Sequence, residues 1–172
     1  IIMKLFNAII FSNVWISFGA VGTTIAFYNF VDLAINYYYL LLVFFATLFA
    51  YNFQYISEQG FNNERQKQTN WITRNLIFIK IVTITSFFIC VSLSLYVFTF
   101  KLWLVSFPVF LLVFFYKKGT LNKFSFRNIP LAKIIIIALC WMFSCSIIPA
   151  LLTKELISIE MSFYIFLYVI AI

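Results

Sequence analysis

The sequence has few charged residues and contains no histidine. Its 172 residues include twelve lysines and arginines and five aspartates and glutamates, so that 10% of the chain is charged. A soluble domain of this size carries roughly a quarter charged residues, because polar groups must cover its surface. The composition therefore excludes a soluble globular protein and an intrinsically disordered chain. The lack of histidine excludes imidazole bases, histidine metal ligands and Ser-His triads.

Cysteine is also scarce, and its spacing does not indicate a metal site. Cys90, Cys140 and Cys145 lie inside apolar runs and form no CxxC pair. We interpret them as small packing residues. Acidic residues are absent from the apolar runs. This absence counts against an ion-coupled transporter, which usually needs ionisable groups near the middle of the membrane.

Apolar residues dominate what is present. Hydrophobic residues make up 65% of the chain, aromatic residues make up 22%, and the mean hydropathy is +1.04. These values predict an integral membrane protein of the all-α class, a polytopic bundle of transmembrane helices. Five stretches are apolar enough to serve as complete spans: 5–27, 37–51, 76–96, 102–116 and 131–152.

A sixth apolar run is too short to cross a bilayer. It begins at Met161 and reaches Ile172, which is only about 18 Å of helix. At the other end of the chain, two isoleucines precede the first methionine, Met3. We expect residues 1–172 to form a single transmembrane domain that is the N-terminal portion of a larger one, with five complete spans and a partial sixth.

The basic residues gather on one side of this predicted topology. That side receives Lys4, three basic residues between the second and third stretches, and five between the fourth and fifth. The other side receives only Lys101 and Lys154. By the positive-inside rule, the N-terminus and both long loops are expected in the cytoplasm, and the protein in a bacterial inner membrane. We interpret the net charge of +7 as a topology signal, and we expect no nucleic-acid partner because no binding motif is present.

Small and hydroxyl residues form a stripe within the third stretch. Thr83, Ser86, Cys90 and Ser94 recur at helical spacing and are expected to share one face. Such a face favours close helix packing, and a substrate-lining face is the alternative. Two prolines bear on helix geometry: Pro108 lies within the fourth stretch, and Pro130 is expected in the first turn of the fifth.

The two long loops carry most of the polar chemistry. Both are rich in Lys, Arg, Asn and Gln, a composition that suits an anionic headgroup such as a diphosphate. The alternative is a pair of solvated loops that contact lipid phosphates. Several aromatic residues fall where the spans would meet the membrane interface and are interpreted as anchors: Tyr37, Tyr38, Trp71, Trp103 and Tyr116.

The order of these features resembles the UbiA superfamily of intramembrane prenyltransferases. The segment Phe11-Ser12-Asn13-Val14-Trp15 is similar to the opening helix of that family, and Asn52 follows at the end of the second stretch. An aromatic and basic loop then leads from Tyr116 to Pro130. The resemblance implies nine transmembrane helices, a cytoplasmic N-terminus, and transfer of a prenyl group from a prenyl diphosphate to a lipophilic acceptor.

The resemblance also implies site residues. Those expected to bind the diphosphate are Asn52, Gln54, Lys117, Lys123 and Arg127. The family holds Mg²⁺ with aspartates that follow the asparagine, but here those positions are Phe53, Ile56 and Gly60. Glu58 and Glu64 lie nearby and are the candidate metal ligands. A second acidic motif of the family would fall beyond Ile172.

Two other functions remain open from the sequence. The chain could be a non-enzymatic component of a transporter or channel, which predicts lost flux on deletion and, in the part of the protein expected beyond Ile172, midplane charges or a paired broken helix. It could also be a structural membrane subunit whose helices pack against a partner protein. The catalytic residues stay unassigned under all three hypotheses.

Overall fold

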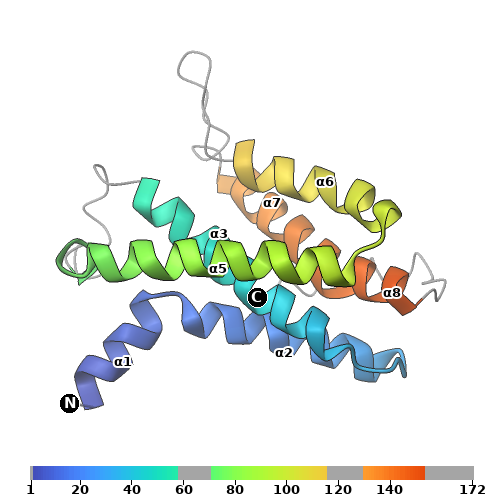
Figure 1. Cartoon of the computed structure of the whole chain (residues 1–172), viewed down its shortest axis with the longest axis horizontal. Helices are drawn as coiled ribbons and strands as arrows, with labels where there is room; N and C mark the ends of the chain where they lie inside the picture. The colour runs from blue at the N-terminus through green and yellow to red at the C-terminus, as the bar shows by residue number, and fades with distance from the viewer. Residues whose placement is uncertain (1, 58–70, 116–129, 154–172) are drawn as a thin grey trace. The chain divides into compact units, whose positions relative to one another are not determined.

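The computed structural model describes residues 2–57, 71–115 and 130–153, and these residues are helical with short connections (Figure 1). No strand occurs in these three ranges, which confirms the predicted all-α class. The helices are α1 (Ile2–Phe11), α2 (Val14–Phe30), α3 (Tyr37–Ser57), α5 (Leu76–Val97), α6 (Phe100–Phe115), and a continuous run of α7 (Pro130–Met142), η3 (Phe143–Ile147) and α8 (Ile148–Thr153).

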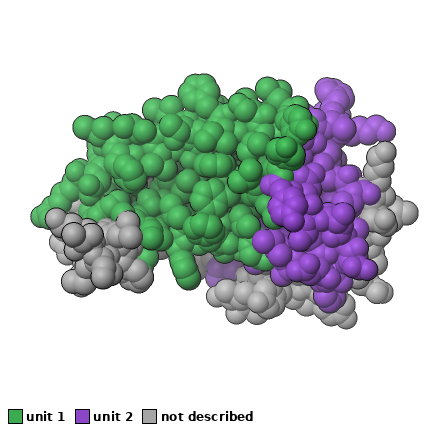
Figure 2. Space-filling view, turned by 60° about the horizontal axis from the view of Figure 1, so that its bottom comes forward, with its two compact units in different colours: residues 1–22, 38–96 green, residues 23–37, 97–172 purple. Residues whose placement is uncertain are grey.

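The chain divides into two compact units, which Figure 2 distinguishes by colour. Unit 1 contains Ile1–Gly22 and Tyr38–Tyr96, and unit 2 contains Thr23–Tyr37 and Val97–Ile172. The boundary falls inside α2, so that one helix contributes residues to both units. The single transmembrane domain remains a prediction, and each unit is described below on its own.

Two helical segments are long and apolar enough to cross a membrane. They are Leu76–Val97, which is α5, and Ile134–Thr153, which runs from α7 through α8. Two shorter helical segments, Val14–Phe30 and Phe100–Leu111, are also apolar. The predicted sixth run, from Met161 to Ile172, lies outside the described residues.

The first predicted span is not one continuous helix. α1 ends at Phe11 and α2 begins at Val14, and Asn13 between them has a positive φ of 64°. A left-handed residue cannot continue a right-handed helix, so the hydrogen-bond ladder is interrupted here. Hydropathy did not reveal the break because apolar residues continue on both sides of it.

The end of α2 is closed by a turn in which an aspartate takes the place of glycine. Asp32 has a φ of 55°, and the Leu33 N–H donates to the Tyr28 carbonyl over 2.9 Å. This is the six-to-one hydrogen bond of a Schellman cap, which needs a left-handed residue just after the helix. The chain then returns through residues 33–36 to the start of α3.

α5 buries four small or hydroxyl residues along one face and exposes most of its large apolar ones, although Thr85 and Ser92 are also exposed. Its buried residues are Ile79, Thr83, Ser86, Cys90 and Ser94, which confirms the face predicted from the spacing. On the opposite face, the Phe88 side chain is 64% exposed. The Thr83 hydroxyl donates to the Ile79 carbonyl over 2.7 Å, so its hydrogen bond is made within the helix. This pattern is the reverse of a soluble core helix and is typical of helix packing in lipid.

Prolines occupy two positions that the sequence predicts. Pro130 is the first residue of α7, where its missing N–H removes no helical hydrogen bond. Pro108 lies inside α6, close to Ser106, whose hydroxyl donates to the Leu102 carbonyl over 2.7 Å. Side-chain bonds of this kind help satisfy carbonyls in apolar helices.

The packing face of α5 can be tested with one substitution at two positions. Ser86→Leu inserts a larger side chain at a site that is 1% exposed, and it should lower the free energy of unfolding by about 1–3 kcal/mol. Ser92→Leu makes the same change on the exposed face and should have an effect within about 0.5 kcal/mol. Loss of helical circular dichroism during titration with dodecyl sulfate in mild-detergent micelles measures both. Equal losses would contradict the packing face.

Candidate functional site

Two asparagines bridge the break between α1 and α2. The Asn13 side-chain Nδ2 donates to Asn52 Oδ1 over 2.8 Å. The Asn52 Nδ2 in turn donates to the backbone carbonyl of Ser12 over 3.0 Å. Asn52 therefore uses both ends of its amide to join α3 to the point at which the first helix is interrupted.

Serine completes the cluster on the side of α2. The backbone N–H and the hydroxyl of Ser17 both donate to the Asn13 carbonyl, each over 3.1 Å. We refer to Ser12, Asn13, Ser17 and Asn52 as the amide cluster. All four residues are buried, and Asn13 and Asn52 are each 1% exposed.

The chemistry of the amide cluster follows from the break in the backbone. Interrupting a helix leaves N–H and carbonyl groups without partners, and each costs free energy in apolar surroundings. Asparagine tolerates the left-handed conformation better than most residues, and its amide can both donate and accept. The Asn52 Oδ1 accepts a hydrogen bond from the Asn13 side-chain amide, and the Asn52 Nδ2 donates one to the Ser12 carbonyl. The cluster thus makes a non-helical turn compatible with an apolar interior.

The structure describes only two of the residues predicted to bind a diphosphate. Asn52 belongs to the amide cluster, and Gln54 lies two positions further along α3 and is partly buried. Two positions along a helix correspond to nearly opposite sides, so Gln54 does not share the face of Asn52. The remaining candidates lie outside the described residues: Lys117, Lys123, Arg127, Glu58 and Glu64.

The described donors do not fit a magnesium site. Within the three described ranges, no group of three His, Cys, Asp or Glu side chains could hold a metal ion. Phe53 and Ile56 stand where the resemblance implies aspartates, and the two ends of the Asn52 amide are already hydrogen-bonded. Mg²⁺ prefers carboxylate oxygens and water, so these residues offer it no adequate shell.

Unit 2 has a second irregular segment, the π-helical turn η3. The Ile148 N–H donates to the Phe143 carbonyl, five residues back. Pro149 follows directly, and its ring would collide with the carbonyl four residues back in an ordinary α-helix. A wider turn before the proline relieves that collision, and such π-bulges often occur at functional sites.

Polar groups line the π-helical turn. The Thr23 hydroxyl donates to Cys145 Sγ over 3.4 Å, and Thr24 also hydrogen-bonds this thiol. The Ser146 hydroxyl donates to the Met142 carbonyl. Cys145 and Ser146 are both buried, so these polar groups are satisfied within the protein. The burial of Cys145 agrees with the prediction that the cysteines are packing residues. The hydrogen bond that its thiol accepts from Thr23 was not predicted.

Sequence reasoning missed the pairing of Asn13 with Asn52. A Ser-Asn pair inside a long apolar run was a usable signal, because both residues favour helix ends and turns. The π-helical turn also had a signal. Pro149 lies within an apolar run that has the length of one continuous span, so the proline must disturb the helix there. Neither signal identifies the partner residue, which comes from a distant part of the chain.

Comparisons with family models, with curated proteins and with solved structures gave no match for this chain.

The left-handed conformation at Asn13 makes a specific prediction. Asn13→Ala loses the amide bond to Asn52 and places an alanine in the left-handed region, whereas Asn13→Gly loses only the bond. The alanine variant should therefore be less stable than the glycine variant by about 1 kcal/mol. Both should be less stable than the parent by about 1–3 kcal/mol, because the buried Asn52 amide loses its partner.

Dodecyl sulfate titration of the two variants measures this difference. The matched control is Asn29→Ala, which changes an exposed asparagine of α2 and should leave the stability within about 0.5 kcal/mol of the parent. If the alanine and glycine variants unfolded at the same dodecyl sulfate fraction, the strained turn at Asn13 would not be a feature of the protein in the membrane.

Proposed function

We propose that the chain belongs to a polytopic integral membrane protein whose N-terminus lies in the cytoplasm of a bacterium, in the inner membrane. The apolar face that α5 exposes supports this placement, because hydrocarbon is the solvent that such a face requires. The uneven distribution of basic residues supports the orientation. Five complete spans and a partial sixth are part of this proposal.

Within that placement, we propose that the protein is UbiA-like and binds a prenyl diphosphate beyond the end of α3. One observation carries the proposal. The two segments that resemble the family, around Asn13 and around Asn52, lie 39 positions apart in the sequence and meet through a hydrogen bond of 2.8 Å. Chance matches of short motifs have no reason to meet through the asparagines that define them.

In this proposal Asn52 is a positioning residue. It fixes the end of α3 against the turn at Asn13, and the polar loop that follows α3 begins five residues after it. Gln54 from α3, together with Lys117, Lys123 and Arg127 from the loop before α7, would supply donors to the diphosphate oxygens.

The activity implied by the resemblance is prenyl transfer to a lipophilic acceptor. The allylic C–O bond breaks, diphosphate leaves with the electron pair, and the acceptor bonds to the prenyl carbon and loses a proton. An apolar cavity in the membrane would shield the allylic carbon from water. The described residues contain no group of side chains that could hold Mg²⁺. Glu58 and Glu64 remain the candidate ligands.

A second function, as a component of a transporter or channel, is favoured by the interrupted helices. The break at Asn13 and the π-helical turn at Phe143–Ile147 both leave irregular backbone within apolar segments. Transporters place substrate sites at such interruptions. However, no aspartate or glutamate lies inside a described helix. At each interruption, the polar side chains are already hydrogen-bonded to groups of the same site. A structural subunit is the remaining alternative.

The direct test uses the full-length protein in proteoliposomes with labelled farnesyl diphosphate. Binding and transfer are measured separately, with and without Mg²⁺, against a panel of quinone-ring and lipid acceptors. Arg127→Gln should weaken binding of the diphosphate about tenfold, because it removes one charge-assisted contact. Lys101→Gln is the matched control: it also removes one cation, from the side of the membrane that the proposal assigns to the exterior, and should leave binding unchanged.

The possible outcomes separate the functions. Transfer to any acceptor supports the enzymatic proposal, and saturable binding without transfer supports a binding protein that has lost the reaction. No binding by the full-length protein, or equal weakening by the two substitutions, contradicts the prenyl diphosphate proposal. Solute flux through proteoliposomes that depends on the protein would favour the transporter or channel instead.

A further inference from the structure

α1 separates its polar and apolar residues more sharply than the other described helices do. By sequence spacing, the two polar residues Lys4 and Asn7 share one face of α1 with Ala8 and Phe11, and the opposite face carries only apolar residues. A helix that crosses a bilayer is apolar over most of its surface, and α5 shows almost no separation of polar from apolar residues. A short helix with two distinct faces is instead typical of one that lies along a membrane surface.

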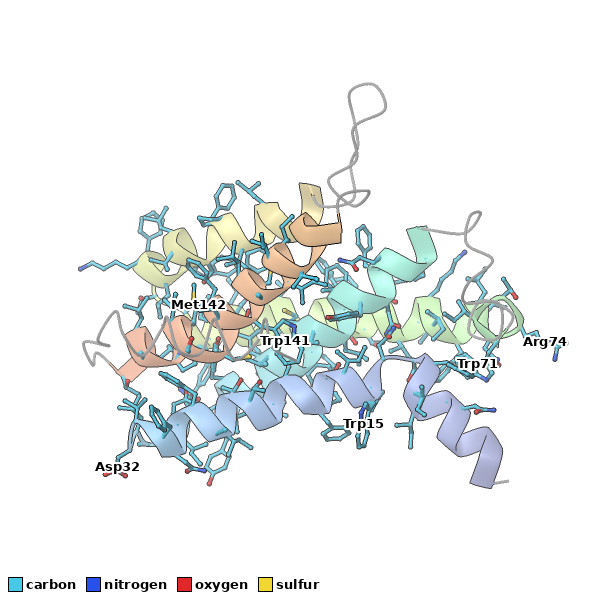
Figure 3. The ribbon with its side chains drawn as sticks, turned by 180° about the vertical axis from the view of Figure 1, so that it is seen from behind. Trp15, Asp32, Trp71, Arg74, Trp141 and Met142 are labelled. Atoms are coloured by element: carbon cyan, nitrogen blue, oxygen red, sulfur yellow. The ribbon has the colours of Figure 1, made fainter. Side chains whose placement is uncertain are left out.

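The end of α1 lies beside residues that mark a membrane boundary. The Phe11 ring packs against Trp71, with ring centroids 5.7 Å apart. Trp71 begins the helical turn that precedes α5, and the exposed Arg74 follows one turn later; Figure 3 shows both at the same end of α5. Tryptophan and arginine gather where hydrocarbon meets the headgroups.

A second tryptophan lies near the break, in the first turn of α2. Trp15 lies two residues beyond the break and is 70% exposed, and in Figure 3 it points away from the neighbouring helices. An exposed tryptophan in the first turn of an apolar helix is the usual interfacial anchor. The break at Asn13 is therefore close to the boundary rather than in the middle of the bilayer.

Tyrosines mark the opposite boundary of unit 1. Tyr38 at the start of α3 contacts Tyr96 near the end of α5, with ring centroids 5.1 Å apart, and both side chains are exposed. From Leu76 to Val97, α5 contains 22 residues, or about 33 Å of helix. That length matches a hydrocarbon core of about 30 Å.

α2 is long enough to cross without α1. It contains 17 residues from Val14 to Phe30, or about 26 Å of helix, which is near the lower limit for a span. With its first residue near the boundary, α2 leaves only about 4 Å of a core of about 30 Å uncrossed. In Figure 1, α1 turns away from the direction of α2 at the break.

We infer that α1 is an interfacial anchor that lies in the plane of the membrane, at the boundary between headgroups and acyl chains, on the side that holds Trp71 and Arg74. The separation of polar and apolar residues in the α1 sequence suits such a position. The amide cluster is then the hinge at which the chain passes from the membrane surface into the span. This inference rests on the proposal that α2 and α5 cross a bilayer, and not on the prenyl diphosphate.

Depth measurements with spin labels test the inference on the full chain in proteoliposomes. Single cysteines are placed at positions 4–11 and 14–21 in a background in which Cys90, Cys140 and Cys145 are alanine. Collision rates of the attached label with oxygen and with a water-soluble nickel chelate report its depth. We expect the nickel rate to alternate along α1 with the helical repeat, so that positions 4 and 7 exceed positions 6 and 9 by about threefold or more. Along α2 it should fall steadily.

A nickel rate that falls steadily from position 4 to position 21 would overturn the inference, because α1 would then enter the bilayer as part of the span. A uniformly high rate along α1 would also overturn it, since α1 would then stand in water. High nickel rates along α2 would contradict the spanning proposal itself. If the cysteine-free background does not fold, benzoyl-phenylalanine at position 6 or 7 of the natural chain replaces the labels. Position 6 should then crosslink to acyl chains at least threefold more than position 7, and equal crosslinking would overturn the inference.

Discussion

The rest of unit 1 depends on how a broken helix is accommodated in apolar surroundings. Backbone groups that lose their helical partners cost free energy when they are buried away from water, so other groups of the protein must satisfy them. Asn52 does this from α3 by bonding both the Asn13 amide and the Ser12 carbonyl. Because the pair is buried, neither residue can be lost without leaving the other amide unsatisfied. One contact thus fixes the end of α1, the start of α2 and the position of α3.

The same constraint explains why the protein places its few polar groups as it does. Along α5, the hydroxyl groups of Thr83, Ser86 and Ser94 face inward, and most of the large apolar residues face outward. At the π-helical turn, Thr23 bonds Cys145, and Pro149 accounts for the widened backbone. In each place a polar or irregular feature is buried against protein.

These features also shape the functional proposals. A buried, fully bonded Asn52 is suited to holding neighbouring segments in place rather than to direct contact with a ligand. The chemistry of a diphosphate site would therefore fall to the loops that flank α3 and α7. The interfacial position inferred for α1 adds a second role for the amide cluster, because the hinge that completes the span also determines where the amphipathic helix lies on the membrane.

The sequence by itself determined the helical class, the approximate bounds of α3, α5 and α6, and the buried face of α5, because apolar length and helical spacing are local properties. It also singled out Asn52, but as a residue that binds a diphosphate and not as the partner of Asn13 and Ser12. Only the tertiary structure decided that the first apolar stretch is broken at Asn13 and that Asn52 is the partner of this break. A left-handed residue inside an apolar run is stable only when a distant side chain satisfies its backbone, and hydropathy carries no information about that partner.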